Sequence, residues 1–367
     1  SSSSRSSSTC CSTPWRALRD SSALANSATP AITQTARQAA PKMTAAWLAD
    51  QQQPDGSWKR TSGYTHNGYD TAWAGLGLLS QGDPAYDGHI RKAAEYLAFR
   101  SPQDHWAVPS AMMIAFLSEY YLRTGDKSIL VALQTQVERL QNQMIYGDWN
   151  SGHGTTPGYR GTGVSIGGSH SALALALADL TPAKVEPEIV NRMLGRAQEL
   201  GPDGYIPYGR ITSVRKFEPD LETGATYSGR HAPYLVASLI HGGPKLFTAN
   251  CSALYTKGAW GGIDQGHATQ SLAMGWALIA ASMVDPEALE RHMEAMRWKF
   301  TMLRCHDGGF GWNAYRLEYQ GGEGLLPNYL RSGTYLVALN AHKRNLAITG
   351  APKYRAKEFR DLPPVCD

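Results

Sequence analysis

The sequence contains little cysteine, little phenylalanine and little charge. Its 5 cysteines are too few and too scattered for a disulfide framework or a four-thiolate zinc site. No uninterrupted apolar run of about 18 residues occurs, so no membrane span is expected. Charged residues make up 18% of the 367 and sum to only +4, which argues against nucleic acid as a partner. Phosphate-cradle, HExxH and HxxxH motifs are absent, so neither a cofactor nor a metal is expected.

Glycine and the polar-tipped aromatic residues are abundant instead. The chain has 37 Gly, 18 Tyr and 10 Trp beside 7 Phe, a mixture typical of aromatic side chains on glycine-rich loops. Residues 1–36 begin Ser-rich and are expected to be disordered or extended. If residues 1–14 follow a removed targeting segment, the protein is secreted, periplasmic or organellar, and the sequence leaves that question open.

Helical periodicity recurs along the rest of the chain, and the helices alternate in chemistry. One set of helices mixes charged and apolar residues, which is typical of a helix with one solvent-exposed face. The other set is rich in Ala, Leu and Gly and almost uncharged. The first set reads as outer helices, over 37–53, 86–99, 128–146, 186–199, 245–256 and 286–304. The second set reads as inner helices, over 69–81, 107–125, 165–180, 223–240, 266–282 and 332–349.

Six alternating pairs, each able to bury its apolar face only against neighbouring pairs, predict an all-α (α/α)6 toroid, a double ring of six outer and six inner helices. The toroid is expected over residues 37–350, with residues 351–367 as a C-terminal tail. Links from an inner to the next outer helix are short, and links from outer to inner helices are long. The alternation places all long links at one end, so this mouth is the expected functional site.

The loops of the mouth are rich in His, Trp, Tyr and Arg, which suits binding and acid–base chemistry on a carbohydrate. Three Asp–Gly steps, which begin at Asp55, Asp203 and Asp307, are interpreted first as turns. The residues expected to bind substrate are His66, Asp70, Trp149, His153, Tyr159, Arg160, Tyr208, Arg210, Glu222, Asp264, His267 and Trp312.

Two chemistries suit these residues. β-Elimination on a uronic acid polymer needs a base, a proton donor and a cation for the carboxylate. His231 or His170 would be the base, Tyr227 the donor and Arg230 the cation, helped by Arg160 or Arg210. Glycoside hydrolysis needs two carboxylates across a cleft, with Asp70, Asp264 and Glu222 as candidates, although Asp70 is equally suited to stabilise a helix start.

Several segments resemble known toroid families. AAWLADQQQPDGSW (from Ala45) and HDGGFGW (from His306) resemble the Gln…Gly-x-Trp repeat of terpenoid cyclase and protein prenyltransferase toroids, and GYDTAW (from Gly68) resembles a segment of class II diterpene cyclases. HNGYDTAW (from His66) and ETGATYSGRH (from Glu222) resemble toroid polysaccharide lyases. Residues 107–350 resemble an uncharacterised bacterial toroid family through LSEYYLRTGDKSIL (from Leu117), GYIPYG (from Gly204), GHATQ (from Gly266) and LAITG (from Leu346).

The sequence therefore predicts a carbohydrate-active enzyme that binds a polysaccharide or oligosaccharide at the mouth of a toroid, with β-elimination slightly favoured. The alternatives are a glycoside hydrolase with paired carboxylates, an isoprenoid enzyme like the terpenoid cyclases and prenyltransferases, and a non-catalytic glycan-binding or assembly protein. The oligomeric state does not follow from the sequence.

Overall fold

A computed structural model describes residues 31–58, 67–100, 107–142, 165–207, 228–258, 260, 270–311 and 328–351. The chain divides into two compact units, Ser1–Ala40 and Pro41–Asp367. The second unit contains an all-helical α/α toroid, and no strand forms within the residues just given. In this part of the chain, no helix has the length and apolar character that a membrane crossing needs.

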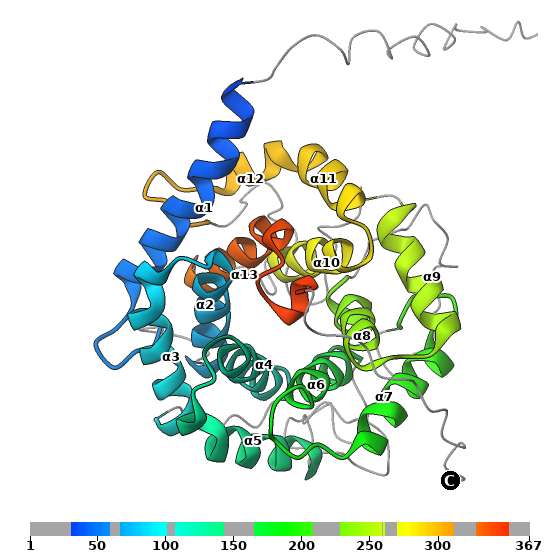
Figure 1. The fold of residues 1–367 in the computed structure, drawn as a ribbon. Coiled ribbons are helices and arrows are strands. Elements are labelled where there is room, and N and C mark those ends of the chain that lie inside the picture. The colour runs from blue at the N-terminus through cyan, green and yellow to red at the C-terminus, as the bar shows by residue number, and fades with distance from the viewer. Residues whose placement is uncertain are drawn as a thin grey trace, which may run out of the picture. The chain divides into compact units, whose positions relative to one another are not determined.

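Six helices of the described part form an inner ring (Figure 1). Each of them contacts the next along the chain, and α13 contacts α2, which closes the ring. This closure confirms the toroid expected from the alternating helix chemistry. The inner helices are α2 (Asn67–Gln81), α4 (Ala107–Thr124), α6 (Ser165–Ala178), α8 (Ser228–His241), α10 (Gln270–Val284) and α13 (Asn328–Leu339).

Outer helices pack against the inner ring, and most of them contact the inner helix on each side (Figure 1). The part of α1 that belongs to the second unit packs on the turn before α13, where the Trp47 indole N–H donates to Asp307. The outer helices are α1 (Ala31–Gln51), α3 (Asp87–Phe99), α5 (Leu130–Asn142), α7 (Pro187–Leu200) and α9 (Lys245–Thr256), followed by the consecutive pair α11 (Pro286–Ala295) and α12 (Arg297–Leu303).

Side-chain burial differs between the inner and the outer helices as their sequences predict. In α6, SIGGSHSALALALA, every residue except Ile166 is buried, because the helix has neighbours on all sides. In α7 the buried residues follow helical spacing on one face: Val190, Asn191, Met193, Leu194 and Ala197.

Glycines allow the first and last inner helices to meet closely, since a Cβ added at Gly77 would lie 2.9 Å from the Gly333 Cα.

The predicted helix boundaries agree with the structure to within a few residues for most helices, and 245–256 matches α9. The prediction of one helix over 332–349 is wrong beyond Leu339. There the chain forms two single 3-10 turns, Ala341–Lys343 and Ala347–Thr349, which end at residues with positive φ, Arg344 (51°) and Gly350 (80°). A residue in the left-handed backbone conformation ends a regular helix, and tertiary contacts hold the two turns in place.

The Asp–Gly steps form the turns expected of them. In each, the aspartate side chain accepts a hydrogen bond from the backbone N–H two residues later, and the glycine adopts a positive φ of 90–101°. Only glycine adopts such a φ without strain. The turns are Asp55–Gly56, Asp203–Gly204 and Asp307–Gly308, and each follows an outer helix. Trp58, after the first turn, is fully buried and donates its indole N–H to Leu48 O at 2.9 Å.

The two ends of the ring differ. At the mouth the chain passes from outer to inner helices, and most of the long links there lie outside the described residues. At the opposite end the inner-to-outer links are short, as between α8 and α9. Residues 340–351, here named the C-terminal segment, contact α8, α10 and α13 at this end (Figure 1).

Aromatic side chains of three inner helices meet inside the ring, between its two ends. Trp73 of α2 and Trp276 of α10 meet edge to face with ring centroids 5.4 Å apart. Trp276 also meets His170 of α6 edge to face at 5.3 Å. These three helices are not neighbours in the ring, so the side chains meet across its axis. All three side chains are at most 1% exposed, and they form a floor beneath the mouth.

Candidate active site at the mouth of the toroid

The first turns of the inner helices carry the charged and titratable side chains of the mouth. Of the predicted site residues, Asp70, His170, Arg230 and His231 lie in described helices. Each is at most 6% exposed. The remaining predicted residues lie outside the described residues: His66, Trp149, His153, Tyr159, Arg160, Tyr208, Arg210, Glu222, Tyr227, Asp264, His267 and Trp312.

His170 has hydrogen bonds at both ring nitrogens. The Trp276 indole N–H donates to Nε2 at 3.1 Å, which assigns the proton of the neutral ring to Nδ1. Nδ1 then donates to Ile166 O at 2.8 Å. Burial lowers the pKa of His170 to about 4, an effect that the bond to Ile166 O partly opposes. His170 is therefore a neutral imidazole with its proton-accepting nitrogen already occupied.

His231 has a different environment. Its ring lies between Tyr205 and Tyr255, with centroids 5.6 and 5.7 Å away. Tyr255 belongs to the outer helix α9, so His231 faces the layer between α8 and α9. Neither of its ring nitrogens has a hydrogen-bond partner among the described residues. Burial, together with the adjacent Arg230 charge, lowers the pKa of His231 to about 3.

Arg230 extends toward the loop that precedes α8. Its guanidinium donates to the Tyr205 hydroxyl at 3.2 Å, and its central carbon lies 5.5 Å from the centre of the Tyr205 ring. The arginine is only 6% exposed. A buried guanidinium held on an aromatic ring is a fixed positive charge beside the mouth.

Asp70 lies in the first turn of α2 and is fully buried. It stands three residues before Trp73, so it shares the lumen-side face of α2 and lies one turn nearer the mouth. The neighbouring Thr71 points to the outer layer, where its hydroxyl accepts the Trp58 backbone N–H at 3.1 Å. The positive end of the helix dipole favours the ionised carboxylate at this position.

Arg331 is a further candidate site residue, which the sequence interpretation missed. It lies in the first turn of α13, is 2% exposed, and donates to Asn328 Oδ1 at 3.0 Å. A buried arginine at the start of an inner helix parallels Arg230 in α8. The available signal was an isolated cation at the start of an apolar segment, YLRSGTYLVAL (from Tyr329).

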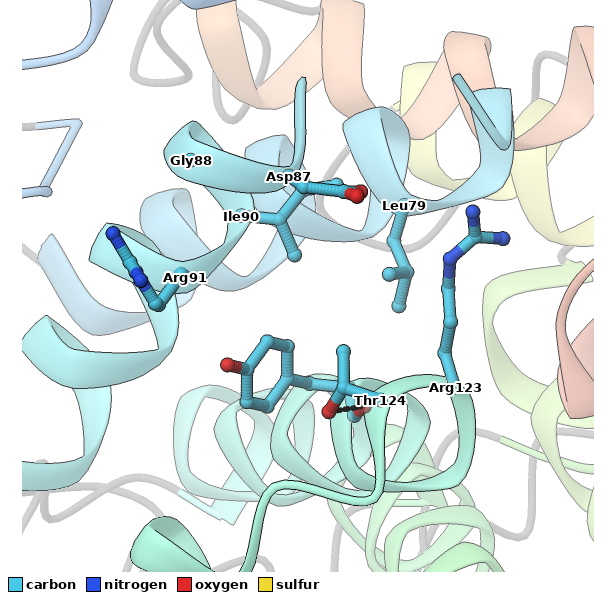
Figure 2. Close-up of a pocket in the computed structure, with 8 residues that line it drawn as sticks. Leu79, Asp87, Gly88, Ile90, Arg91, Arg123 and Thr124 are labelled. Atoms are coloured by element: carbon cyan, nitrogen blue, oxygen red, sulfur yellow. Dashed lines mark hydrogen bonds between the residues drawn. The ribbon is translucent and has the colours of Figure 1, made fainter. Parts of the chain in front are cut away.

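The described residues contain no group of three or more His, Cys, Asp or Glu side chains that could hold a metal ion. A separate cavity of about 680 Å³ lies away from the mouth, where α2 and α4 end and α3 begins (Figure 2). Its lining includes Arg91 and Arg123 on opposite sides of the opening, and it contains none of the predicted site residues.

Residues 30–350 match the family described as a domain of unknown function, DUF6288. The chain belongs to this family. No curated protein sequence matches it.

Solved structures resemble the chain in fold. An α-1,6-mannanase, GH76A of Salegentibacter sp., is 9% identical, with 83% of this chain and 99% of that chain covered and a TM-score of 0.57. The type II terpene cyclase MstE from Scytonema is 12% identical, with 85% and 99% covered and a TM-score of 0.55. A cellobiose 2-epimerase from Spirochaeta thermophila is 14% identical, with 85% and 98% covered and a TM-score of 0.54. These likenesses establish the α/α-toroid fold of this member of the family.

Proposed function

We propose that this protein is a carbohydrate-active enzyme whose substrate binds at the mouth of the toroid, and that it hydrolyses a glycosidic bond. The observation that carries the proposal is the buried carboxylate of Asp70 on the lumen-side face of α2, one turn above the aromatic floor. A mannanase and a cellobiose epimerase among the structures of the same fold support a sugar as the substrate.

Hydrolysis is favoured over elimination by the state of the two histidines. Elimination needs a base with an open nitrogen and a pKa near the working pH. Nε2 of His170 already accepts the Trp276 N–H, and burial keeps the pKa of both histidines far below neutrality. A carboxyl group beside a glycosidic bond can instead act in its ionised form as nucleophile or general base, while a second, protonated carboxyl group donates to the leaving oxygen.

In this proposal Asp70 is one member of the carboxylate pair, and Glu222 or Asp264 supplies the other. Hydrolysis of this kind places the two carboxyl groups about 5–10 Å apart on opposite sides of the scissile bond. One protonates the leaving oxygen, and the other acts as nucleophile or activates water. Trp149, Tyr159, Tyr208 and Trp312 stack on sugar rings, and His66, His153 and His267 bind hydroxyl groups.

Elimination is the second candidate, because both ring nitrogens of His231 are without a partner among the described residues. Since this ring lies between Tyr205 and Tyr255, elimination also requires Tyr205 to move and admit the substrate. In that reaction His231 removes the proton beside a uronic acid carboxylate and Tyr227 protonates the leaving oxygen. Arg230, with Arg160 or Arg210, holds the carboxylate, as an oxyanion needs fixed positive charge.

The test is incubation of the full chain with neutral and uronic acid oligosaccharides and polymers. New reducing ends are measured together with the ultraviolet absorbance of unsaturated sugars. Hydrolysis predicts reducing ends without an absorbance rise. An absorbance rise in step with the new ends would replace hydrolysis by elimination, and neither signal on any substrate would overturn both.

The carboxylate is tested with Asp70→Asn, which removes the acid while preserving its shape. Loss of a positioned acid or base lowers the rate about 10²–10⁴-fold. Asp87→Asn is the matched control, since Asp87 is an exposed carboxylate in the first turn of α3. If D70N retains wild-type turnover at an unchanged melting temperature, Asp70 has no catalytic role.

A further inference from the structure

The C-terminal segment is tied to the end of α2 by side chains. Asn345 Nδ2 donates to Ser80 O at 3.0 Å, and Lys343 Nζ donates to Gln81 O at 3.2 Å. Asn340 Nδ2 adds bonds to Ser80 Oγ at 3.1 Å and to Gln81 Oε1 at 2.9 Å. The last carbonyl groups of a helix have no partner inside it, so these donors cap α2.

A buried carboxylate holds the same segment from another helix. Glu119 of α4 is 2% exposed, and its two oxygens accept the backbone N–H groups of Ala347 at 3.0 Å and Ile348 at 2.8 Å. These N–H groups begin a single 3-10 turn and would otherwise be unpaired inside the protein. Hydrogen bonds to an ionised acceptor are stronger than neutral ones, so Glu119 is the main anchor at this point.

The anchor joins two sequence segments that the proposed reaction does not use. Glu119 belongs to LSEYYLRTGDKSIL and its partners belong to LAITG, both of which carry the resemblance to an uncharacterised toroid family. They are more than 200 residues apart, as the separations of 228 and 229 between the bonded residues show. The fold brings them together at the end of the ring opposite the mouth.

We propose that residues 340–351 form a clasp, held by Glu119 on one side and by the last turn of α2 on the other, which fastens the last inner helix to the first and opens as a local unit. The ring closes where α13 packs on α2, with Gly77 and Gly333 at the closest approach and the Ser80 hydroxyl donating to Leu336 O at 3.4 Å. The directed polar bonds of the clasp add to this contact beyond the end of α13.

Backbone geometry supports a separate opening unit. The clasp begins after the end of α13 at Leu339 and passes through left-handed residues at Arg344 (φ 51°) and Gly350 (φ 80°). Its polar bonds to the ring run from its own side chains to α2 and from its backbone to Glu119 of α4, and not through a continuous helix. Leu346, Ala347 and Ile348 are buried, so opening costs more than for an exposed loop, but it does not require a helix to unwind.

The test is hydrogen exchange of the full chain, compared between wild type and Glu119→Gln. Glutamine keeps one acceptor but turns an N–H₂ group toward the second amide. We expect exchange at 346–350 to accelerate about tenfold or more, while amides of α6 keep their wild-type rates. Glu95→Gln is the control, since Glu95 is exposed on α3 and forms only a surface pair with Arg91, and it should change neither region.

Asn345→Ala gives an independent test, because it removes the hydrogen bond to Ser80 O and leaves Glu119 intact. It should accelerate exchange in the same residues, 346–350, by a smaller factor. Unchanged exchange there in both variants would overturn the clasp. Equal acceleration in 346–350 and α6 would overturn it as well, because the residues would then open only with the whole toroid.

Discussion

At the scale of single residues, His170 and Trp276 form a hydrogen-bonded pair at the centre of the molecule. The pair fixes the tautomer of the imidazole, since Nε2 accepts from Trp276 and Nδ1 donates to Ile166 O. A histidine in the first turns of an inner helix is attractive as a catalyst on sequence grounds. Its bonding shows that it also completes the floor of the lumen.

Trp276→Phe should destabilise the protein by about 1–3 kcal/mol, because it leaves Nε2 of His170 buried without a donor and removes part of the aromatic packing. The measurement is urea unfolding at neutral pH. Trp298→Phe is the control, since Trp298 is 64% exposed on α12 and should change the free energy of unfolding by less than about 0.5 kcal/mol. Equal stability of the two variants would contradict the assigned bond.

At the scale of elements, the contact between α2 and α13 depends on glycine. A Cβ at Gly333 would meet the backbone of Trp73, and one at Gly77 would lie 2.9 Å from Gly333 Cα. The two helices therefore approach more closely than helices with larger residues at the contact. The same glycines look unfavourable when each helix is considered alone, because glycine weakens an isolated helix.

Gly77→Ala should therefore destabilise the toroid despite its better helix propensity, by about 1–3 kcal/mol from overpacking. Gly195→Ala in α7 is the matched control, since nothing lies within 4 Å of the added Cβ. It should stabilise by about 0.5–1 kcal/mol. Thermal or urea unfolding measures both variants, and a gain in stability from G77A would show that the two backbones have room to separate.

At the scale of the whole molecule, buried histidines make stability depend on pH. Burial lowers the pKa of His170 to about 4 and that of His231 to about 3, below the ordinary value of 6.5 in the unfolded chain. Between pH 6.5 and these values the unfolded state binds more protons than the folded state. The free energy of unfolding is therefore highest above pH 6.5 and falls as the solution is acidified.

Each of these two histidines should contribute a slope of about 1.4 kcal/mol per pH unit below pH 6.5. His231→Asn removes one titrating group and should lower the slope of the unfolding free energy by that amount between pH 6 and 5. Urea unfolding across this range measures the slope. His342→Asn, at an exposed histidine outside the inner helices, is the variant with which the slope of H231N is compared. A slope equal to wild type in H231N would refute the contribution assigned to His231.

The sequence by itself determined the architecture. Helical periodicity, the alternation of amphipathic and uniformly apolar helices, and the Asp–Gly turns are local properties, and together they indicated a closed double ring. The same reasoning placed Asp70, His170, Arg230 and His231 in the first turns of inner helices, because helix starts follow from local patterns. It missed Arg331, which no motif marked.

Only the tertiary structure decided which side chains meet. Local patterns do not show that Trp73, Trp276 and His170 meet across the lumen, or that His231 faces α9, since these contacts join residues far apart in the chain. The predicted helix over 332–349 failed for the same reason. Residues 340–351 leave the helical path to bond with α2 and Glu119, and long-range hydrogen bonds of this kind override a local preference for helix.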